Sequence, residues 1–359
     1  MPEQFNAVLR AFFGRGQRCR WSVIGQGNIN DTFLVHSGRG SFILQRINGE
    51  VFPDPEFVAE NTAQVSSHIR DVLNVHDIAA FPEVFPTVHG QNYFKDSNGA
   101  VWRAQKYISN SMVYESLQRP EQAFEIGRCL GRFHRICKTL SPATLKETLP
   151  GFHDLPKYIG KFEEAWAVRL TQSSDDLLLC LDCVERLKEQ SSFFTDSEQR
   201  GELQLAVTHG DPKVSNVLFD NRGDRALTLI DLDTVGPGLI LQDLGDCLRS
   251  CSCRTKEDDS DASIACEPDL VAQAVAGYTT ENALSKFEQE HLYTALLLIT
   301  FELGVRFLTD YLEGNRYFKI EHSDDNLHRA LVQFKLVRSI EAQQELLRTC
   351  IASAVHRSS

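Results

Sequence analysis

One stretch constrains the fold more than any other: residues 207–233, which read VTHGDPKVSNVLFDNRGDRALTLIDLD. Two short apolar runs in it flank a cluster of turn-forming residues, Asn221 to Asp224. Apolar, β-rich runs on either side of an Asn/Gly/Asp cluster predict a β-hairpin. Folding the hairpin back on itself brings together the polar residues at its two ends. These are His209, Asp211, Lys213 and Asn216 before the hairpin, and Asp231 and Asp233 after it.

This polar set has the composition of a phosphoryl-transfer site. A carboxylate, an Asn five residues later and an Asp after the following strand form the arrangement that protein kinases use. In this interpretation Asp211 is the catalytic base, and Lys213 reaches the transferred phosphate as a point charge. Asn216 and Asp231 hold Mg²⁺, with Asp233 as a further oxygen ligand. The alternative, an Asx-rich turn beside a strand, would suit a lone H-x-D motif but explains three ordered pieces poorly.

Length and composition narrow the remaining possibilities. A chain of 359 residues suits two domains or lobes better than one ordinary core. The net charge of −12 argues against nucleic acid as a partner, because phosphate backbones would be repelled. No apolar run approaches the roughly 20 residues that cross a bilayer, and the first residues lack the features of a signal peptide. We therefore expect a cytoplasmic protein with no membrane partner.

The sequence contains 10 cysteines, which we expect to be reduced thiols. Cys180 and Cys183 lie within a helical pattern. A second group comprises Cys247, Cys251, Cys253 and Cys266. Because their spacings do not match those of zinc sites with four ligands, we predict that these cysteines pack in the core.

The N-terminal third of the chain reads as an antiparallel sheet. Strands are predicted near residues 21–24, 32–36, 41–47, 84–88 and 100–108, with helices near 5–14 and 57–75. The turn between the first two strands offers backbone N–H groups that can cradle phosphate oxygens. Its residues are Gly25, Gly27, Asn28, Ile29 and Asn30. A plain hairpin is the alternative, because G-x-G alone is a weak signal.

Further residues complete the predicted nucleotide site. Arg46 lies in the strand where a kinase carries its phosphate-binding lysine, so it is the candidate for phosphate contact. Glu60, on the following helix, is placed to pair with Arg46, although an exposed helix carboxylate explains it equally well. A segment leading into the second lobe would present backbone groups to an adenine ring. That segment contains Gln105, Tyr107 and Ile108. ATP, bound with Mg²⁺, is the predicted cofactor.

Beyond about residue 120, helices replace strands. Helices are predicted near residues 120–137, 158–170, 175–190, 268–282, 286–313 and 325–354, with an acidic loop at 255–263. The expected fold is α+β, protein-kinase-like and bilobal. A small antiparallel-sheet N-lobe spans 1–108 and binds the nucleotide. A larger, mainly helical C-lobe spans 109–359 and carries the catalytic loop and the acceptor site. No G-x-x-x-x-G-K-[ST] motif is present, which excludes a P-loop kinase.

The sequence resembles the aminoglycoside phosphotransferase and choline kinase superfamily, which has a protein-kinase-like bilobal fold. The resemblance is carried by GQGNINDTF at 25–33, FILQRIN at 42–48, THGDPKVSNVLFD at 208–220, IDLDTVGPG at 230–238, DLGD at 243–246 and FELGVRFLTDYLEGNRYFK at 301–319. Within this superfamily it looks most like the bacterial N-acetylhexosamine 1-kinases. The Gln-Arg pair in place of the strand Lys, the IDLDTV-x-PG form and the last block point to that branch.

The resemblance implies ATP-dependent phosphorylation of the anomeric hydroxyl of N-acetylglucosamine or N-acetylgalactosamine, by a monomer or weak homodimer. It places Asp211 as the base beside the sugar, and Arg306 and Tyr317 as sugar contacts. Asp310 lies one helical turn beyond Arg306 and either forms a salt bridge with it, which we favour, or reaches the sugar. Asn28 stands where that branch often carries His near the sugar, so the acceptor preference of this chain can differ.

Two alternatives stay open at this point. A kinase of the same fold could act on another sugar, an aminoglycoside, choline or homoserine. Cationic acceptors would favour an acidic pocket, which the loop at 255–263 could supply. A catalytically inactive nucleotide-binding module would explain the missing strand lysine, but the intact Asp211, Asn216 and Asp231 argue against it.

Overall fold

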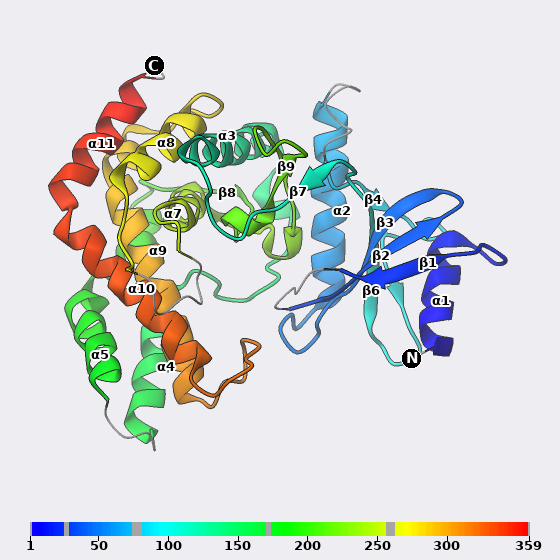
Figure 1. Cartoon of the computed structure of the whole chain (residues 1–359), viewed down its shortest axis with the longest axis horizontal. Coiled ribbons are helices and arrows are strands. Elements are labelled where there is room, and N and C mark those ends of the chain that lie inside the picture. Colours follow the sequence, from blue (N-terminus) through cyan, green and yellow to red (C-terminus); the bar gives the residue numbers. More distant parts are fainter. Residues whose placement is uncertain (1, 25–28, 74–80, 170–173, 256–262, 358–359) are drawn as a thin grey trace.

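The computed structural model of the chain describes residues 2–24, 29–73, 81–169, 174–255 and 263–357. A sheet-rich N-terminal part lies beside a larger helical part, and helix α2 (Pro55–Val72) stands between them (Figure 1). This arrangement confirms the predicted α+β, bilobal architecture.

The N-terminal part is organised around one antiparallel sheet. Its strands follow the order β1-β2-β3-β6-β4, and β5 also pairs with β6. They span Arg20–Val23 (β1), Asp31–Ser37 (β2), Gly40–Arg46 (β3), Val84–Phe85 (β4), Phe94–Lys95 (β5) and Val101–Lys106 (β6). Helix α1 (Pro2–Phe13) packs on one face of this sheet, where Phe12 is buried in a cluster with Phe42 and Leu44. Helix α2 contacts β4 and β6, so it separates the sheet from the C-terminal part.

The predicted hairpin is present and lies in the C-terminal part. Strands β9 (Val217–Asp220) and β10 (Ala226–Leu229) pair antiparallel, and β7 (Ser111–Met112) extends this sheet on the β9 side. A second pair joins β8 (Leu205–Thr208) to β11 (Gly236–Leu239). The segment before β9 forms the 3-10 turn η4 (Val214–Asn216). The polar ends of the hairpin therefore sit on short turns that are held by paired strands.

Helices make up the rest of the C-terminal part. They are α3 (Pro120–Cys137), α4 (Leu155–Val168), α5 (Asp175–Leu187), α6 (Phe193–Gln199), α7 (Ile240–Cys251), α8 (Pro268–Thr279), α9 (Lys286–Leu312), α10 (Asp325–Ala342) and α11 (Gln344–Arg357). Further 3-10 turns are η2 (Pro142–Thr144), η3 (Lys188–Gln190) and η5 (Leu232–Thr234). The single helix expected over residues 325–354 is in fact two, because the backbone of Gln343 leaves the helical region between α10 and α11.

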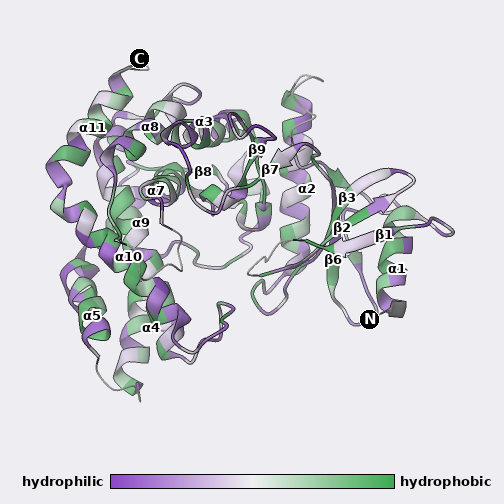
Figure 2. Ribbon diagram, viewed as in Figure 1, coloured by the Kyte–Doolittle hydropathy of each residue, from purple (hydrophilic) through white to green (hydrophobic). Residues whose placement is uncertain are grey.

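The core of the C-terminal part forms around α9. Among the described helices only α9 is long and apolar enough to cross a membrane, but 83% of its apolar window is buried inside the protein. It is therefore the central core helix. Figure 2 shows that α11, on the outside of the bundle, alternates between hydrophilic and hydrophobic segments, as a helix with one covered face does.

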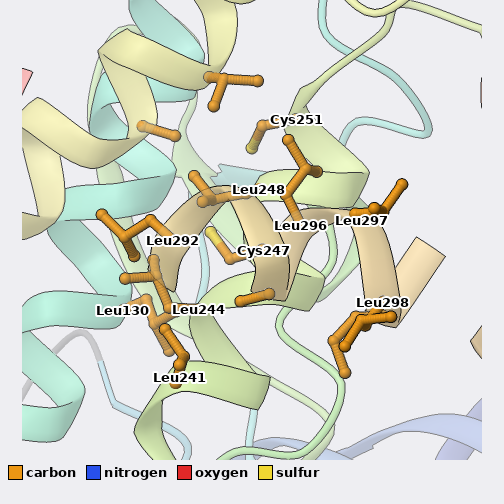
Figure 3. Close-up of a cluster of buried hydrophobic side chains, with 14 of the residues drawn as sticks. Leu130, Leu241, Leu244, Cys247, Leu248, Cys251, Leu292, Leu296, Leu297 and Leu298 are labelled. Atoms are coloured by element: carbon orange, nitrogen blue, oxygen red, sulfur yellow. The ribbon is translucent and has the colours of Figure 1, made fainter. Parts of the chain in front are cut away.

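The predicted packing role of the cysteines is confirmed for the two groups in this part. Cys247 of α7 points between leucines of α7 and α9, and Cys251 lies one turn further along α7 (Figure 3). Both thiols are fully buried, as are those of Cys180 and Cys183 on α5. Among the described residues no group of three or more His, Cys, Asp or Glu side chains is arranged to hold a metal ion by itself. The buried thiols thus contribute to the core as small apolar groups.

Candidate active site

The loop that we predict to be catalytic runs from β8 into η4 and contains Asp211. The Oδ2 atom of Asp211 accepts a hydrogen bond from Asn216 Nδ2 at 2.9 Å and pairs with Lys213 Nζ at 2.9 Å. Asn216 Nδ2 also donates to the Asp211 carbonyl oxygen at 2.8 Å, which fixes the five-residue loop. The structure therefore brings together three residues that the sequence predicted as a functional set.

The neighbours of Asp211 keep its carboxylate ionised. Burial alone would raise the pKa of Asp211, but the Lys213 ammonium outweighs that effect and lowers the pKa below its ordinary value. His209 is buried, which lowers its pKa and keeps the ring neutral. Its Nε2–H donates to the Ile230 carbonyl oxygen at 2.9 Å, while Nδ1 accepts the Asp211 backbone N–H at 3.3 Å. One donor and one acceptor thus meet the two nitrogens of a neutral imidazole.

A buried network that the sequence did not reveal braces this loop from behind. Asp243 of α7 accepts the backbone N–H of His209 at 2.8 Å and that of Gly210 at 2.7 Å. His134 of α3 contacts the same carboxylate at 2.8 Å through Nε2, and Tyr278 of α8 contacts its other ring nitrogen at 2.8 Å. Three helices therefore hold the backbone that positions Asp211. The DLGD motif at 243–246, which contains Asp243, could have indicated this network. Its residue pattern by itself predicts only the start of a helix.

Asp231 lies at the far end of the hairpin with a left-handed backbone, φ +62°. Loss of hydration in the cleft, together with the carboxylates of Asp233 and Asp211, raises the pKa of Asp231 to about 7. A carboxylate that resists ionisation because negative charge is concentrated around it is well suited to bind a divalent cation. Mg²⁺ in kinase sites typically takes one or two protein carboxylates plus substrate phosphates. Asn216 and Asp231 fit that pattern.

Asp233 occupies a different position from the one we expected. Its Oδ1 forms an ion pair with Arg103, and its Oδ2 accepts a hydrogen bond from Asn30 Nδ2. Both partners belong to the N-terminal part, and Asp233 itself is only 5% exposed. Because protein donors occupy both oxygens, we keep Asn216 and Asp231 as proposed metal ligands and assign Asp233 to the contact between the lobes.

Arg46 does not lie where we expected the phosphate-binding residue, because side chains alternate between the two faces of strand β3. Phe42 and Leu44 of β3 pack toward α1, so Arg46, two residues further on, points to the same side and away from α2. It is half exposed and pairs with Asp31 on the neighbouring strand at 2.5 Å. The structure therefore does not bring Arg46 to the catalytic cluster.

The basic side chain on the inner face is Arg103 of β6, which the sequence analysis missed. Its Nε and Nη2 atoms donate to Gln45 Oε1 at 3.1 and 2.9 Å, and Nη1 donates to Thr62 Oγ1 at 2.9 Å. Together with the ion pair to Asp233, these bonds hold the buried guanidinium in place and give each of its three nitrogens a partner. The register that places Gln45 opposite Arg103 could have indicated this, since paired residues share one face of a sheet.

Glu60 also lies outside the cluster. Its side chain is exposed on α2, and the adjacent Asn61 and Thr62 face the C-terminal part instead. Asn61 Nδ2 donates to the carbonyl oxygens of Val235 and Lys146 at 2.8 and 2.7 Å. The expected Glu60–Arg46 pair is therefore absent from the described ion pairs. The contact between α2 and the segment that follows η5 is made by the Asn61 amide instead.

Part of the predicted nucleotide turn can be placed. Gly25, Gly27 and Asn28 lie outside the described residues. Asn48 Nδ2 donates to the Ile29 carbonyl oxygen at 3.3 Å, and Asn30 Oδ1 accepts the Asn48 backbone N–H at 3.0 Å. The end of the turn is thus tied both to the segment after β3 and, through Asn30, to Asp233.

The segment between the lobes has the backbone pattern of a hinge. Gln105 is buried in β6, and the Tyr107 N–H donates to the Ser41 carbonyl oxygen at 3.0 Å. The next backbone N–H, that of Ile108, has no hydrogen-bond partner within the described residues. The Ile108 N–H directly follows the last hydrogen bond of the sheet. It can therefore donate to a planar ligand that carries a hydrogen-bond acceptor on its edge.

Arg306, Asp310 and Tyr317 line one pocket of about 240 Å³, so the three predicted acceptor residues are brought together. Three aromatic rings surround the Arg306 guanidinium. The distances from its central carbon to the ring centroids are 5.0 Å for Phe152, 5.3 Å for Tyr158 and 5.8 Å for Phe318. No carboxylate of the described residues lies within ion-pair distance of Arg306.

The expected salt bridge between Asp310 and Arg306 is therefore wrong. The Asp310 carboxylate instead accepts the backbone N–H groups of Arg316, Tyr317 and Phe318 at 2.8, 2.8 and 2.9 Å. Asn326 Nδ2 donates to the same carboxylate at 2.8 Å. Asp310 thus shapes the loop after α9 and brings Tyr317 and Phe318 to the pocket, while Arg306 forms no ion pair with any described carboxylate.

Comparison with known proteins assigns this geometry to a family. A family model described as the phosphotransferase enzyme family matches residues 20–283. The chain has the fold of a microcompartment-associated aminopropanol kinase, with 17% identity, coverage of 97% of this chain and 99% of that chain, and a TM-score of 0.66. It is similar at 16% identity to an aminoglycoside phosphotransferase from Alicyclobacillus acidocaldarius, with coverages of 97% and 96% and a TM-score of 0.65.

A third similar structure, amicoumacin kinase hAmiN, was solved in complex with AMP-PNP, Ca²⁺ and Ami. Identity to it is 15%, the coverages are 98% of this chain and 92% of that chain, and the TM-score is 0.55. These likenesses establish the kinase-like fold over nearly the whole chain.

Proposed function

Because the chain belongs to the phosphotransferase enzyme family, we propose that it transfers a phosphoryl group from ATP to the anomeric hydroxyl of an N-acetylhexosamine. The product would be the sugar 1-phosphate. The observation that carries this proposal is an Asp211 carboxylate paired with Lys213, together with an aromatic pocket whose Arg306 has no ion-pair partner among the described residues.

Asp211 accepts or orients the proton of the attacking hydroxyl in this mechanism. General-base assistance of this kind is worth roughly 10²–10⁴-fold in rate. The Lys213 ammonium keeps the Asp211 carboxylate ionised and would meet negative charge on the phosphoryl group. Asn216 and Asp231 would hold Mg²⁺, which when bound with ATP supplies charge neutralisation at the phosphates.

The nucleotide would lie between the lobes. The Ile108 N–H, which has no hydrogen-bond partner among the described residues, is our candidate for the edge of an adenine ring, and Ile29 and Asn30 belong to our candidate for the phosphate site. A related kinase binds AMP-PNP with a divalent cation, which supports ATP and a metal as the cofactors of this chain.

The pocket chemistry supports a neutral, oxygen-rich acceptor. Aromatic rings stack on the apolar faces of a sugar, and a guanidinium donates to its hydroxyl or acetamide oxygens. Lys157 and Lys161 also line the pocket and, with Arg306, outnumber its two carboxylates, Asp310 and Glu313. Four N–H donors already bind the Asp310 carboxylate. A cationic acceptor such as choline or an aminoglycoside would meet positive charge there, which makes it the weaker candidate. The loop that could have supplied negative charge, residues 256–262, lies outside the described residues.

A coupled ADP-release assay with Mg²⁺-ATP tests the proposal. The acceptor panel contains N-acetylglucosamine, N-acetylgalactosamine, glucose, galactose, choline and kanamycin, and NMR identifies the phosphorylated position. We expect turnover with the N-acetylated sugars and a sugar 1-phosphate as product. Turnover with choline or kanamycin alone would overturn the acceptor assignment but keep the kinase activity. Binding of ATP without turnover of any acceptor would favour the inactive nucleotide-binding module.

A further inference from the structure

His153 connects the catalytic loop to the acceptor pocket, and nothing in the mechanism above uses it. It follows Phe152, whose ring lies against Arg306, and it precedes α4. Its backbone is left-handed, with φ +59°, a conformation that side-chain-bearing residues rarely adopt. Gln242 Nε2 of α7 donates to the His153 carbonyl oxygen at 2.9 Å, which helps to hold this conformation.

Both ring nitrogens of His153 face acceptors. Nδ1 lies 2.9 Å from Glu302 Oε1, and Nε2 lies 3.2 Å from the carbonyl oxygen of Gly210, the residue before Asp211. A neutral imidazole has one donor only, so it cannot satisfy both contacts beside a carboxylate. The pair needs one further proton, either as imidazolium with carboxylate or as imidazole with a protonated Glu302. Loss of that proton leaves one acceptor facing another.

The surroundings of His153 favour the charged form. Burial by itself would lower the pKa of His153, but the Glu302 carboxylate outweighs burial and raises the pKa above its ordinary value. Asp246 of α7 acts in the same direction, and Arg306 of α9 opposes it. Glu302 is only 1% exposed, and its Oε2 has no hydrogen-bond partner among the described residues. The carboxylate therefore depends on His153 for its compensation.

We propose that His153 is a positioning residue for the phosphoryl transfer: protonated between Glu302 and Gly210, it holds the catalytic loop in register with the acceptor pocket. The role rests on the proposed kinase function. Glu302 lies one turn before Arg306 on α9, so a single rigid helix carries both the partner of His153 and the arginine of the pocket. Deprotonation removes the bond to Gly210, and with it the link between Asp211 and that helix.

The protonation of His153 predicts the direction in which kcat changes with pH. A group whose pKa is raised in the folded protein keeps its contribution at low pH and loses it as the pH rises through that pKa. We therefore expect kcat to fall on the alkaline side of the His153 pKa. The Glu302→Gln variant should lose this fall, because its amide can donate to Nδ1 of a neutral imidazole while Nε2–H still bonds Gly210.

The test measures kcat and both KM values against pH for wild type, His153→Gln and Glu302→Gln. His68→Gln is the matched control, because His68 also contacts a backbone carbonyl oxygen, that of Ile136, but lies away from the catalytic loop. We expect His153→Gln to lower kcat by about 10²-fold, as a misplacement near 1 Å does, with KM for ATP within about twofold of wild type. His68→Gln should leave kcat and its pH profile unchanged.

A second measurement needs neither turnover nor the His153 variant. Imidazole ¹⁵N NMR of the wild-type protein should show one ring that stays protonated on both nitrogens above the pH at which ordinary histidines titrate, and Glu302→Gln should remove that signal. If no acceptor is phosphorylated but this signal is present, the proposed function fails and the proton assignment stands. An unchanged alkaline limb in Glu302→Gln, or a wild-type spectrum without such a ring, would overturn the role of His153.

Discussion

Asp211 holds its charge between an ammonium and an amide donor, so replacing it tests the chemistry at a single residue. We expect Asp211→Ala to reduce kcat by about 10²–10⁴-fold, because the attacking hydroxyl loses its base. The melting temperature should stay near that of wild type, since the Asp211 side chain is 32% exposed and packs in no apolar cluster. Asp224→Ala, an exposed aspartate at the tip of the same hairpin, is the control and should retain full activity. Near-normal turnover in folded Asp211→Ala would remove Asp211 from the mechanism.

Arg306 makes a second prediction at this scale. The Arg306→Ala substitution should raise KM for the acceptor far more than KM for ATP, because the guanidinium faces the pocket and has no carboxylate partner among the described residues. A matched control is Arg348→Ala, which removes another guanidinium over an aromatic ring, 4.5 Å from the Tyr293 centroid, outside the pocket. Steady-state kinetics in both substrates give the comparison. Equal increases in the two KM values would argue against an acceptor contact.

Single residues also show where sequence reasoning reaches its limit. Asp211, Lys213 and Asn216 lie within six positions of one another, so local spacing was enough to predict their cluster. Arg103 was missed because its partner Asp233 is 130 positions away on the turn η5, and only the packing of the N-terminal sheet against the C-terminal part brings the two near. The expected contact between Asp310 and Arg306 failed for a related reason. Backbone donors in the following loop, invisible to helix periodicity, take the carboxylate.

The turn at Gly210 is an element whose geometry can be tested directly. Its φ is +86°, and an added Cβ would lie 2.8 Å from Thr234, so this position needs glycine. We expect Gly210→Ala to destabilise the protein by about 1–3 kcal/mol and to lower kcat, because the loop carrying Asp211 must shift. Gly201→Ala is the control, since Gly201 has a similar φ of +73° but nothing within 4 Å of the added carbon. Thermal unfolding and kcat separate backbone strain from loop displacement.

If both glycine variants lose the same stability and neither loses activity, the contact with Thr234 is unimportant.

The elements as a whole were largely predictable, because the hairpin and the long helices have strong periodicity. The break at Gln343 was not, since the apolar pattern continues through it into α11.

At the scale of the whole molecule, the Arg103–Asp233 ion pair joins the N-terminal sheet to the turn η5 of the C-terminal part. Both side chains are almost completely buried, with exposures of 1% and 7%. Replacing either one alone by Leu leaves an uncompensated buried charge, and we expect a loss of about 3–5 kcal/mol in the free energy of unfolding. The double variant should lose less than the sum of the two. Denaturant unfolding of the four proteins provides the double-mutant cycle.

The exposed pair Arg119–Asp224 supplies the matched cycle. Its side chains are 48% and 58% exposed, and such pairs contribute roughly 0–1 kcal/mol. Similar coupling energies in the two cycles would contradict a special role for the interlobe pair.

Asn61 of α2 has one further consequence. Its amide bonds three backbone groups of the C-terminal part: the carbonyl oxygens of Lys146 and Val235, and the N–H of Lys146. Helix α2 therefore contacts both lobes, because its Val58 and Ala59 also pack with Ile47 and Val101 of the smaller one. After a cut near residue 109, we expect the two fragments to elute together in size-exclusion chromatography, because these contacts do not depend on the cut bond.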